Sequence, residues 1–303
     1  MGNFNKHFHS IKISDFHKKN NLYGFINFIA TLTVIALILY ATKVLENSLL
    51  HILFFIVIGT LQHRLSIFLH ECLHFSLFKN KTLNIFVGKV SAYLIFFNWG
   101  YRKIHLKHHM HLGQDDDPDA ENYIYYPNGL KFFTKDLLLN LLGIAAFTQF
   151  LHQNLNFKKT DTNANSSSEK LPLLIIHSLI FSLFFFSGFW WGYFVFWIFP
   201  LVTIAKTLAH FRNVAEHVLL RPIPNNKNLE RLRTIKSNFF EKFFFAPLGF
   251  NYHAEHHMFP GVPYHKLASL SCKLMEQPYY KENIDYYNGG YCSLLIKRVL
   301  KPN

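Results

Sequence analysis

Four long runs of apolar residues constrain the fold of this chain more than any other feature of its sequence. They lie at about residues 22–41, 49–69, 171–187 and 188–209. A helix of about 20 apolar residues crosses the ~30 Å hydrocarbon core of a bilayer, because each residue adds ~1.5 Å. The short breaks after the first run and at residues 187–188 are typical of turns between neighbouring helices. We therefore expect an all-α membrane protein with four transmembrane helices in two hairpins.

The segments around these runs are interpreted as parts of one domain over residues 1–303. They comprise a polar N-terminal arm (1–20), two shorter apolar segments (about 83–97 and 137–151), a polar segment (156–170) and a C-terminal tail (268–303). The shorter apolar segments are too brief or too interrupted to span a bilayer, so we expect helices at the membrane surface or buried in the protein. The composition of the polar segment is typical of a flexible linker.

The distribution of charge predicts an orientation for the helices. Lysine and arginine (31) outnumber aspartate and glutamate (18), which gives a net charge of +13. A basic, soluble nucleic-acid-binding protein would share this charge but not the apolar runs, so no nucleic-acid partner is expected. Lys43 is the only basic residue in the two short connections between paired runs. Because basic residues favour the cytoplasmic side of a membrane, we expect both termini to lie in the cytoplasm.

The chain contains 19 histidines, and nine of them fall in four short clusters. The clusters are His70 and His74; His105, His108 and His109; Asn213 and His217; and His253, His256 and His257. Residues three and four apart share one face of a helix, so the side chains of each cluster point the same way. Each cluster lies at the cytoplasmic end of a run or in a cytoplasmic segment. Nine imidazoles exceed the needs of one metal ion, so the pattern predicts two, with four or five nitrogen ligands each.

The residue types in the clusters favour a pair of irons. Imidazole suits zinc, copper, iron and nickel, whereas structural zinc sites usually include cysteines, and here Cys72, Cys272 and Cys292 form no matched pair. A carboxylate that accepts the second N–H of a ligating histidine fixes its tautomer. We expect that supporting role for acids in or next to the clusters, namely Glu71, Asp117, Glu216 and Glu255. Scattered histidines, such as His63 and His177, are interpreted as surface or core residues, and His111 and His210 lie near clusters but outside their spacing.

At these clusters the sequence resembles the membrane fatty-acid desaturase superfamily, the di-iron enzymes with three histidine boxes, and in particular its short bacterial members. The similarity covers about residues 61–267 and includes the segments HECLHFSLFKN, HLKHHMHLGQDDDPD, RNVAEH and FNYHAEHHMFPGVPYHKL. It implies a four-span helical protein in a bacterial inner membrane, with a cytosolic helical cap that holds two iron ions. The implied metal ligands are His70, His74, His105, His108, His109, His217, His253, His256 and His257, with Asn213 acting through a water. It implies no catalytic side chain beyond these ligands.

The resemblance also implies an O2-dependent desaturase that introduces a double bond into a fatty acyl chain of a membrane lipid or an acyl-coenzyme A. The sequence contains no His-Pro-Gly-Gly motif of a fused cytochrome b5, so electrons are expected from a separate ferredoxin, cytochrome or similar carrier. Phenylalanine-rich segments (181–189 and 239–245) are candidates for lining an acyl tunnel. Basic residues are candidates for holding a phosphate or an acidic carrier; they are Lys103, Lys107, Arg212, Arg231 and Arg233.

Two other functions compete with desaturation of an acyl chain. A carotenoid ketolase or hydroxylase, or a hydroxylase of lipids or alkanes, would share the histidine boxes and insert oxygen instead. A histidine-rich metal transporter or sensor belongs to a different class. Transport requires polar ligands at mid-span that face a pathway. The clusters lie at the ends of the predicted spans, which argues against transport.

Overall fold

The structure is a computed structural model that describes residues 8, 10–112, 114, 116–119, 129–155, 167–217 and 232–299. Four of its helical stretches are long and apolar enough to cross a membrane. They are α1 (Asn21–Val44), α2 (Ser48–Leu73), most of α7 (Ser167–Phe186) and the stretch Trp190–His217. The last consists of α8 (Trp190–Tyr193), two π-helical segments, η5 (Phe194–Ile198) and η6 (Leu201–Ala205), and α9 (Lys206–His217). The four predicted apolar helices are therefore present, and α1 and α2 are longer than the apolar runs that indicated them.

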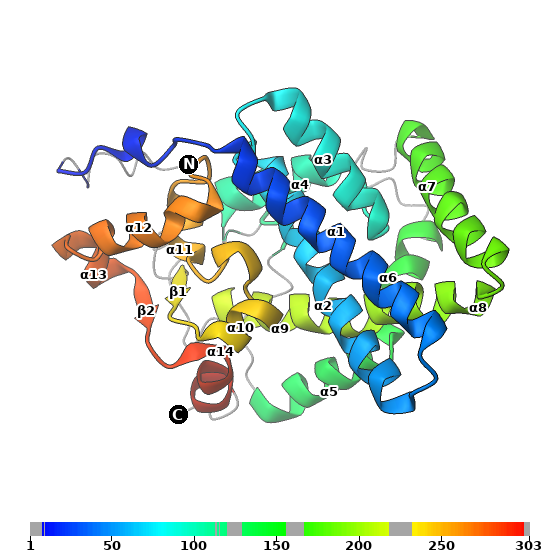
Figure 1. Cartoon of the computed structure of the whole chain (residues 1–303). Coiled ribbons are helices and arrows are strands. Elements are labelled where there is room, and N and C mark those ends of the chain that lie inside the picture. The colour runs from blue at the N-terminus through cyan, green and yellow to red at the C-terminus, as the bar shows by residue number, and fades with distance from the viewer. Residues whose placement is uncertain are drawn as a thin grey trace.

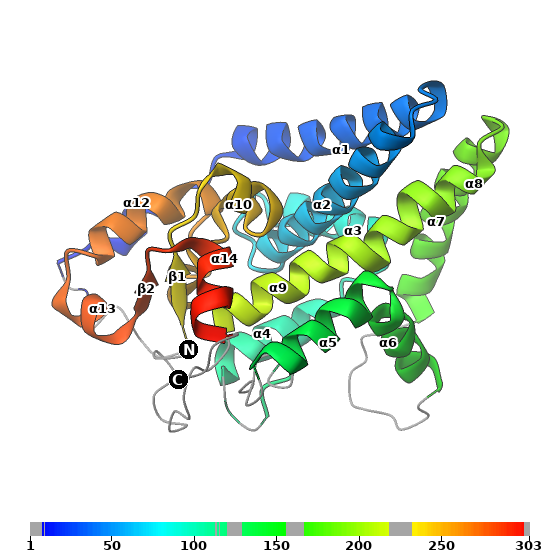
Figure 2. The ribbon, with the colours of Figure 1, turned by 90° about the horizontal axis from the view of Figure 1, so that it is seen from below.

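Helices α1 and α2 are joined by three residues and pack against each other, as Figures 1 and 2 show. The side chains of Asn20 and Asn47 cap the N-termini of the two helices by accepting hydrogen bonds from backbone N–H groups. Arg64 of α2 donates to Thr31 Oγ1 (3.1 Å) and Asn27 Oδ1 (2.8 Å) of α1. These bonds satisfy a guanidinium inside an apolar helix pair and fix how the two helices lie against each other.

The second pair, α7 and α8, turns at residues 187–188, where the sequence predicts a break. Gly188 has a φ of +76°, a conformation that costs an L-residue about 1–2 kcal/mol. The fourth stretch then crosses α2 closely at Gly59, where an added Cβ would lie 2.5 Å from Ile204 Cβ. Gln62 Nε2 donates to the carbonyl oxygen of Trp197 at 2.8 Å in the same crossing. This crossing fixes where α9 runs relative to α2.

The shorter helices between the second and third spans differ in part from expectation. They are α3 (Lys81–Leu94), α4 (Tyr101–His111), α5 (Gly129–Leu141) and α6 (Ile144–Leu155). The apolar segment at 137–151 is not one helix, because Gly143 has a φ of +72° and separates α5 from α6. Residues 167–170, assigned to the linker, are the first turn of α7, and Glu169 accepts from Lys89 Nζ and Tyr93 Oη. Residues 156–166 lie outside the described residues.

Residues 232–299 form a separate group of small elements, here called the C-terminal lobe. It contains α10 (Phe239–Phe244), the 3-10 turn Pro247–Gly249, α11 (His253–Met258), α12 (Tyr264–Leu274), α13 (Pro278–Asn283), α14 (Gly290–Leu294) and the π-helical segment Leu295–Val299. A 3-10 turn near the N-terminus (Ile13–Asp15) precedes α1. In Figure 2 the lobe lies at one end of the molecule and the far ends of the apolar helices lie at the other.

Two features of the C-terminal lobe correct the sequence analysis. Strands β1 (Arg233–Ile235) and β2 (Asp285–Tyr287) pair in parallel, so the fold is mostly helical but not all-α. The described part of the expected tail, residues 268–299, is packed into the lobe, because Tyr280 and Tyr291 are both 0% exposed. These residues are too polar to predict a core from their pattern alone, and they become buried by contact with distant segments.

Candidate metal centre

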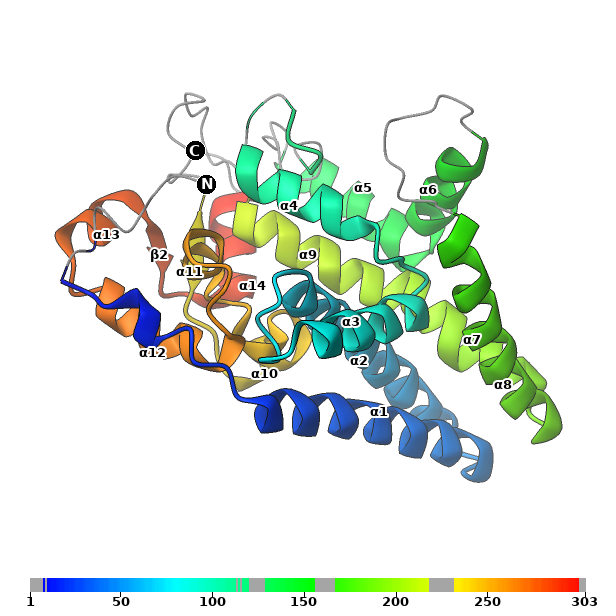
Figure 3. The same cartoon turned by 90° about the horizontal axis from the view of Figure 1, so that it is seen from above.

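The histidine clusters lie on or at the end of four helices, α2, α4, α9 and α11, whose places in the fold can be followed in Figure 3. His70 lies in the last turn of α2, and His74 caps that helix at its C-terminus. His105, His108 and His109 project from α4, His217 is the last residue of α9, and His253, His256 and His257 lie on α11. Segments far apart in the sequence therefore deliver all nine predicted ligands to one place.

The imidazoles form two adjoining groups that can each hold a metal ion. The five-histidine group consists of His70, His74, His105, His109 and His256. The three-histidine group consists of His108, His217 and His257. Within each group the candidate ligand atoms lie within 4.8 Å of one another. The stacked rings of His109 and His257, with centroids 4.0 Å apart, join the two groups.

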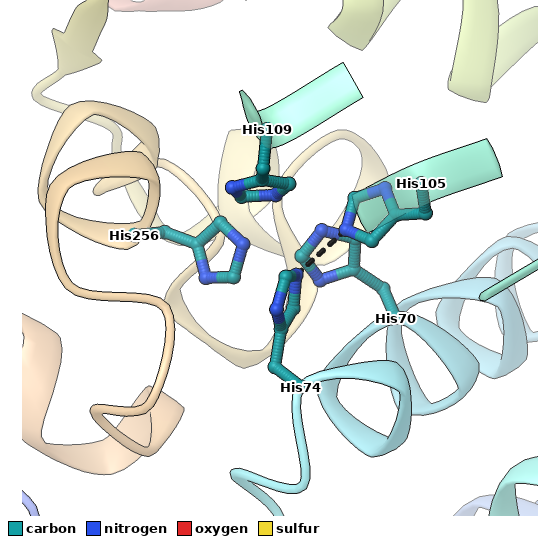
Figure 4. A group of neighbouring side chains, drawn as sticks. All are labelled: His70, His74, His105, His109 and His256. Atoms are coloured by element: carbon teal, nitrogen blue, oxygen red, sulfur yellow. Dashed lines mark hydrogen bonds between the residues drawn. The ribbon is translucent and has the colours of Figure 1, made fainter. Parts of the chain in front are cut away.

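Figure 4 shows the five rings of the first group directed toward one another. His74 Nε2 and His105 Nε2 lie 2.7 Å apart there. His253 stands in the same relation to the three-histidine group, with its Nε2 2.7 Å from His217 Nε2. Two ligands about 2.1 Å from one metal and at right angles to each other lie ~3 Å apart. The spacing of both pairs is therefore that of neighbouring ligands on one ion.

Several ring nitrogens at the centre are buried without a hydrogen bond inside the described part of the chain. Both nitrogens of His109 and of His256, and Nε2 of His257, are in this state. Leaving a buried polar atom without a partner costs about 1–3 kcal/mol. Each of these three neutral rings has one nitrogen with a free lone pair, and the three rings fit the presence of metal ions that would bind one lone pair from each.

The electrostatics of the site keep the imidazoles neutral. Burial, reinforced by neighbouring imidazoles, holds the pKa well below its ordinary value at His105, His109, His253, His256 and His257. Burial, and then the charge of Arg102, lowers the pKa of His74 to about 3. A histidine must be unprotonated at its ligating nitrogen to bind a metal. The site therefore presents lone pairs at neutral pH.

Asp117 lies where a supporting carboxylate is expected. Its Oδ1 is 3.0 Å from His108 Nδ1, and both side chains are buried. A carboxylate at that distance keeps the proton on Nδ1 and leaves Nε2 for a metal. Glu216 also lies close to a candidate ligand, with Oε2 3.5 Å from His253 Nδ1. Asn213 is half-buried one turn before His217 on α9, and its role through a water stays a prediction.

The other two predicted supporting acids bind elsewhere. Glu71 accepts from Ser76 Oγ (2.8 Å) and from the backbone N–H of Tyr264 (3.3 Å), and its nearer oxygen is 3.9 Å from His70 Nδ1, beyond hydrogen-bonding range. Glu255 accepts from Thr234 Oγ1 (2.5 Å) and Tyr280 Oη (2.6 Å). Burial raises the pKa of Glu255. The hydrogen bonds of both acids thus tie the histidine helices to neighbouring backbone and hydroxyl groups.

Two of the basic candidates for holding a phosphate or an acidic carrier contact the protein interior instead. Arg233 is buried, where its Nε donates to Asp285 Oδ2 (2.7 Å) and its Nη1 donates to the carbonyl oxygen of Ala215. The guanidinium of Arg212 lies 4.3 Å from the ring centroid of Phe250. Both arginines thus contact other side chains or backbone inside the protein, whereas Lys103 and Lys107 are exposed. Arg231 lies outside the described residues.

Other predictions outside the centre have mixed outcomes. His177 is a buried core residue, as expected. Its Nδ1 lies 3.0 Å from Tyr193 Oη and its Nε2 lies 2.8 Å from the carbonyl oxygen of Tyr93. Of the phenylalanine-rich segment 239–245, Phe239 and Phe240 are 77% and 70% exposed, so they do not line an interior tunnel. Sequence reasoning missed Tyr280 and Tyr291, which contact glutamates of the histidine motifs from positions with no local signal.

Comparison with known proteins identifies the family. A family model described as fatty acid desaturase matches residues 47–288. The chain belongs to the fatty acid desaturase family. It is 30% identical over 261 residues to the dihydrorhizobitoxine desaturase of Bradyrhizobium elkanii, a match that covers 77% of this chain and 70% of that protein. The predicted superfamily is confirmed, and this desaturase-family chain is an oxidoreductase with a histidine-rich group that can hold metal.

Proposed function

We propose that this protein is a membrane di-iron oxidoreductase that uses O2 and external electrons to introduce a double bond into a fatty acyl chain of a lipid. The observation that carries the proposal is the pair of adjoining, mostly buried imidazole groups, to which the C-terminal ends of two of the apolar helical stretches contribute. A family model for fatty acid desaturases supports the acyl substrate. When bound, the irons would supply the O2 chemistry that removes hydrogen from an unactivated C–H, which side-chain acids and bases cannot do.

The residues of the chain hold and insulate this chemistry. The five-histidine group would bind one iron, and the three-histidine group with His253 would bind the other, with Asn213 acting through a water. Asp117 orients His108, and the buried imidazole cluster excludes bulk water from the reacting centre. A separate protein would deliver the electrons, and the site and both termini would face the cytoplasm of a bacterial cell.

A second candidate is desaturation of a molecule that is not a membrane lipid. The observation that favours it is the similarity to an enzyme named for dihydrorhizobitoxine. Both candidates use the same metal centre and each removes two hydrogens from its substrate, so they differ in which molecule reaches the centre. The hydroxylase and ketolase alternatives have less support, because both relationships carry desaturase names.

The test is expression in a host that lacks its own desaturases, followed by mass spectrometry of lipids and of small metabolites. We expect about two irons per purified chain and a new unsaturated acyl chain that is absent with the His108→Ala variant. Unchanged acyl chains with a small product two hydrogens lighter would favour the second candidate. An oxygenated lipid or carotenoid would contradict desaturation, and exchangeable zinc without oxidase activity would contradict the enzyme class.

The proposed orientation has its own reporter in the native cysteines. Cys272 and Cys292 are exposed, whereas Cys72 is buried. In a Cys292→Ser protein, a membrane-impermeant thiol reagent should therefore report on Cys272, in the same lobe as α11. We expect labelling in inside-out vesicles of the bacterial inner membrane. Labelling in intact spheroplasts but not in inside-out vesicles would place the metal centre on the other side.

A further inference from the structure

Two tyrosines of the C-terminal lobe each bind a glutamate that belongs to a histidine motif. Tyr291 Oη donates to Glu216 Oε1 at 2.6 Å, and Tyr280 Oη donates to Glu255 Oε1 at 2.6 Å. Both tyrosines are 0% exposed, and the glutamates are 1% and 0% exposed. The two pairs are equal in length and burial, and they differ in what the second oxygen of each carboxylate faces.

The second oxygen of Glu216 faces a candidate metal ligand. Glu216 Oε2 lies 3.5 Å from His253 Nδ1, and His253 Nε2 lies 2.7 Å from His217 Nε2. Neither Glu216 Oε2 nor His253 Nδ1 has a hydrogen-bond partner within the described ranges. A histidine that binds a metal through Nε2 carries its proton on Nδ1 and needs an acceptor there. Glu216 is the carboxylate placed to serve as that acceptor.

The second oxygen of Glu255 is already occupied. It accepts from Thr234 Oγ1 at 2.5 Å, while the first accepts from Tyr280. This carboxylate therefore links α11 to β1 and α13. Tyr280 and Glu255 form a structural brace of the same kind as Tyr291 and Glu216, but without a bond directed at an imidazole, which makes this pair a matched control inside the same lobe.

Arg212 explains why the tyrosine matters for the orientation of Glu216. Arg212 Nε is 3.7 Å from Glu216 Oε2, so the guanidinium competes with His253 for the same oxygen. The bond from Tyr291 fixes Oε1 and thereby the rotation of the carboxylate. Without that bond, the carboxylate is free to turn toward Arg212, because a charge-assisted bond to a guanidinium is stronger than one to a neutral imidazole.

We propose that Tyr291 is a positioning residue for the metal site of the three-histidine group. It holds Glu216 so that Oε2 faces His253 Nδ1 and His253 is kept in its ligating orientation. The C-terminal lobe thus supplies the outer support of one metal site from a residue that is 75 positions from Glu216 in the sequence. This inference rests on the proposed function, since it requires that His253 and the three-histidine group bind iron.

The test compares iron retention in the full-length protein, its Tyr291→Phe and Tyr280→Phe variants, and a Glu216→Gln variant. Each purified protein is dialysed against graded chelator and its bound iron counted, and the unfolding midpoint of the metal-free form is measured in parallel. Tyr291→Phe should weaken the binding of one of the two irons by about 10–100-fold. Tyr280→Phe should lower the unfolding midpoint while both irons stay bound at the original chelator concentration.

Glu216→Gln supplies the second line of evidence, because it keeps the size of the side chain and replaces one oxygen by a donor. It should lose the same iron, and combining it with Tyr291→Phe should add little, since both act through one interaction. Full iron retention by Tyr291→Phe, or equal iron loss from Tyr291→Phe and Tyr280→Phe, would overturn the inference. Absence of iron from the unmodified protein would instead overturn the proposed function.

Discussion

The five-histidine and three-histidine groups use the same ligand type but are held in place differently. The rings of the five-histidine group pack on one another and on Phe250, which lies 4.6 Å from His70 between ring centroids. The three-histidine group is bordered by carboxylates, with Asp117 on His108 and Glu216 close to His253. Ring packing is therefore common to both groups, and the three-histidine group has carboxylates beside its rings in addition.

This difference implies that mutations of the supporting residues should act on one site at a time. Ring packing depends on the shape of the whole interior, so the five-histidine group should tolerate the loss of a single hydrogen bond. A carboxylate acts on one imidazole, so a change in the charge of that carboxylate directly alters the tautomer of the imidazole beside it. The three-histidine group should therefore be the more sensitive of the two to isosteric changes in charge.

The largest effects are expected from the ligands themselves. His256→Ala removes a ligand from the five-histidine group and His108→Ala removes one from the three-histidine group. Both variants should lose turnover completely while remaining inserted in the membrane, because the chemistry needs both metals. Each should also keep the iron of the unchanged group, which metal analysis of the purified protein would reveal.

The matched control is His265→Ala, whose ring packs edge-on against Tyr23 and Tyr264 rather than on the cluster. It should keep both irons and normal product formation. Product formation at the normal rate by His108→Ala or His256→Ala would remove that residue from the set of ligands. Loss of both irons from either variant would show that the groups are not independent sites.

A smaller and more selective effect is expected from the acids. Asp117→Asn removes the charge that holds the proton of His108 on Nδ1, and should weaken iron binding at the three-histidine group by about 10–100-fold. Glu71→Gln changes an acid whose oxygen accepts from Ser76 and Tyr264. It should lower the unfolding midpoint with little change in iron affinity. Iron loss of the same size in both variants would contradict the difference between the groups.

The sequence predicts which histidines lie together better than it predicts their surroundings, for a physical reason. Histidines such as His105, His108 and His109 share one helical turn, so their convergence follows from helix geometry alone. The apolar helices could be predicted equally well, because their composition requires burial in lipid or protein. These features are local, and local patterns can be recognised in a single sequence.

The supporting contacts depend instead on pairs that are distant in sequence. Tyr291 and Glu216 are 75 residues apart, and Thr234 and Glu255 meet only because β1 packs beside α11. A short polar stretch such as 285–287 gives no sign that it will pair with Arg233–Ile235. The same limit explains why Arg212 and Arg233 were candidates for holding a phosphate or an acidic carrier, because the side chains that they contact in the interior come from distant parts of the sequence.

The smallest effects should come from two glycines that let helices cross closely, each in contact with an element that leads to one of the groups. An added Cβ at Gly59 would lie 2.5 Å from Ile204 Cβ and 2.9 Å from the carbonyl oxygen of Pro200. An added Cβ at Gly88 would overlap the ring of Trp99 and lie 2.8 Å from Cys72 Cβ. Gly59→Ala should displace the stretch that ends at His217, and Gly88→Ala should displace the end of α2 that carries His70.

Each substitution should cost about 1–3 kcal/mol of stability, the usual range for overpacking. Gly59→Ala should cost more than Gly88→Ala, because the backbone carbonyl of Pro200 cannot rotate away from the added Cβ. Gly188→Ala is the control, since a Cβ there meets no atom within 4 Å and only the φ of +76° opposes it. Measured in the His256→Ala background, where only the three-histidine group is filled, Gly59→Ala should weaken the remaining iron and Gly88→Ala should not. The reverse result would mean that α2, rather than the crossing helix, sets the geometry of the three-histidine group.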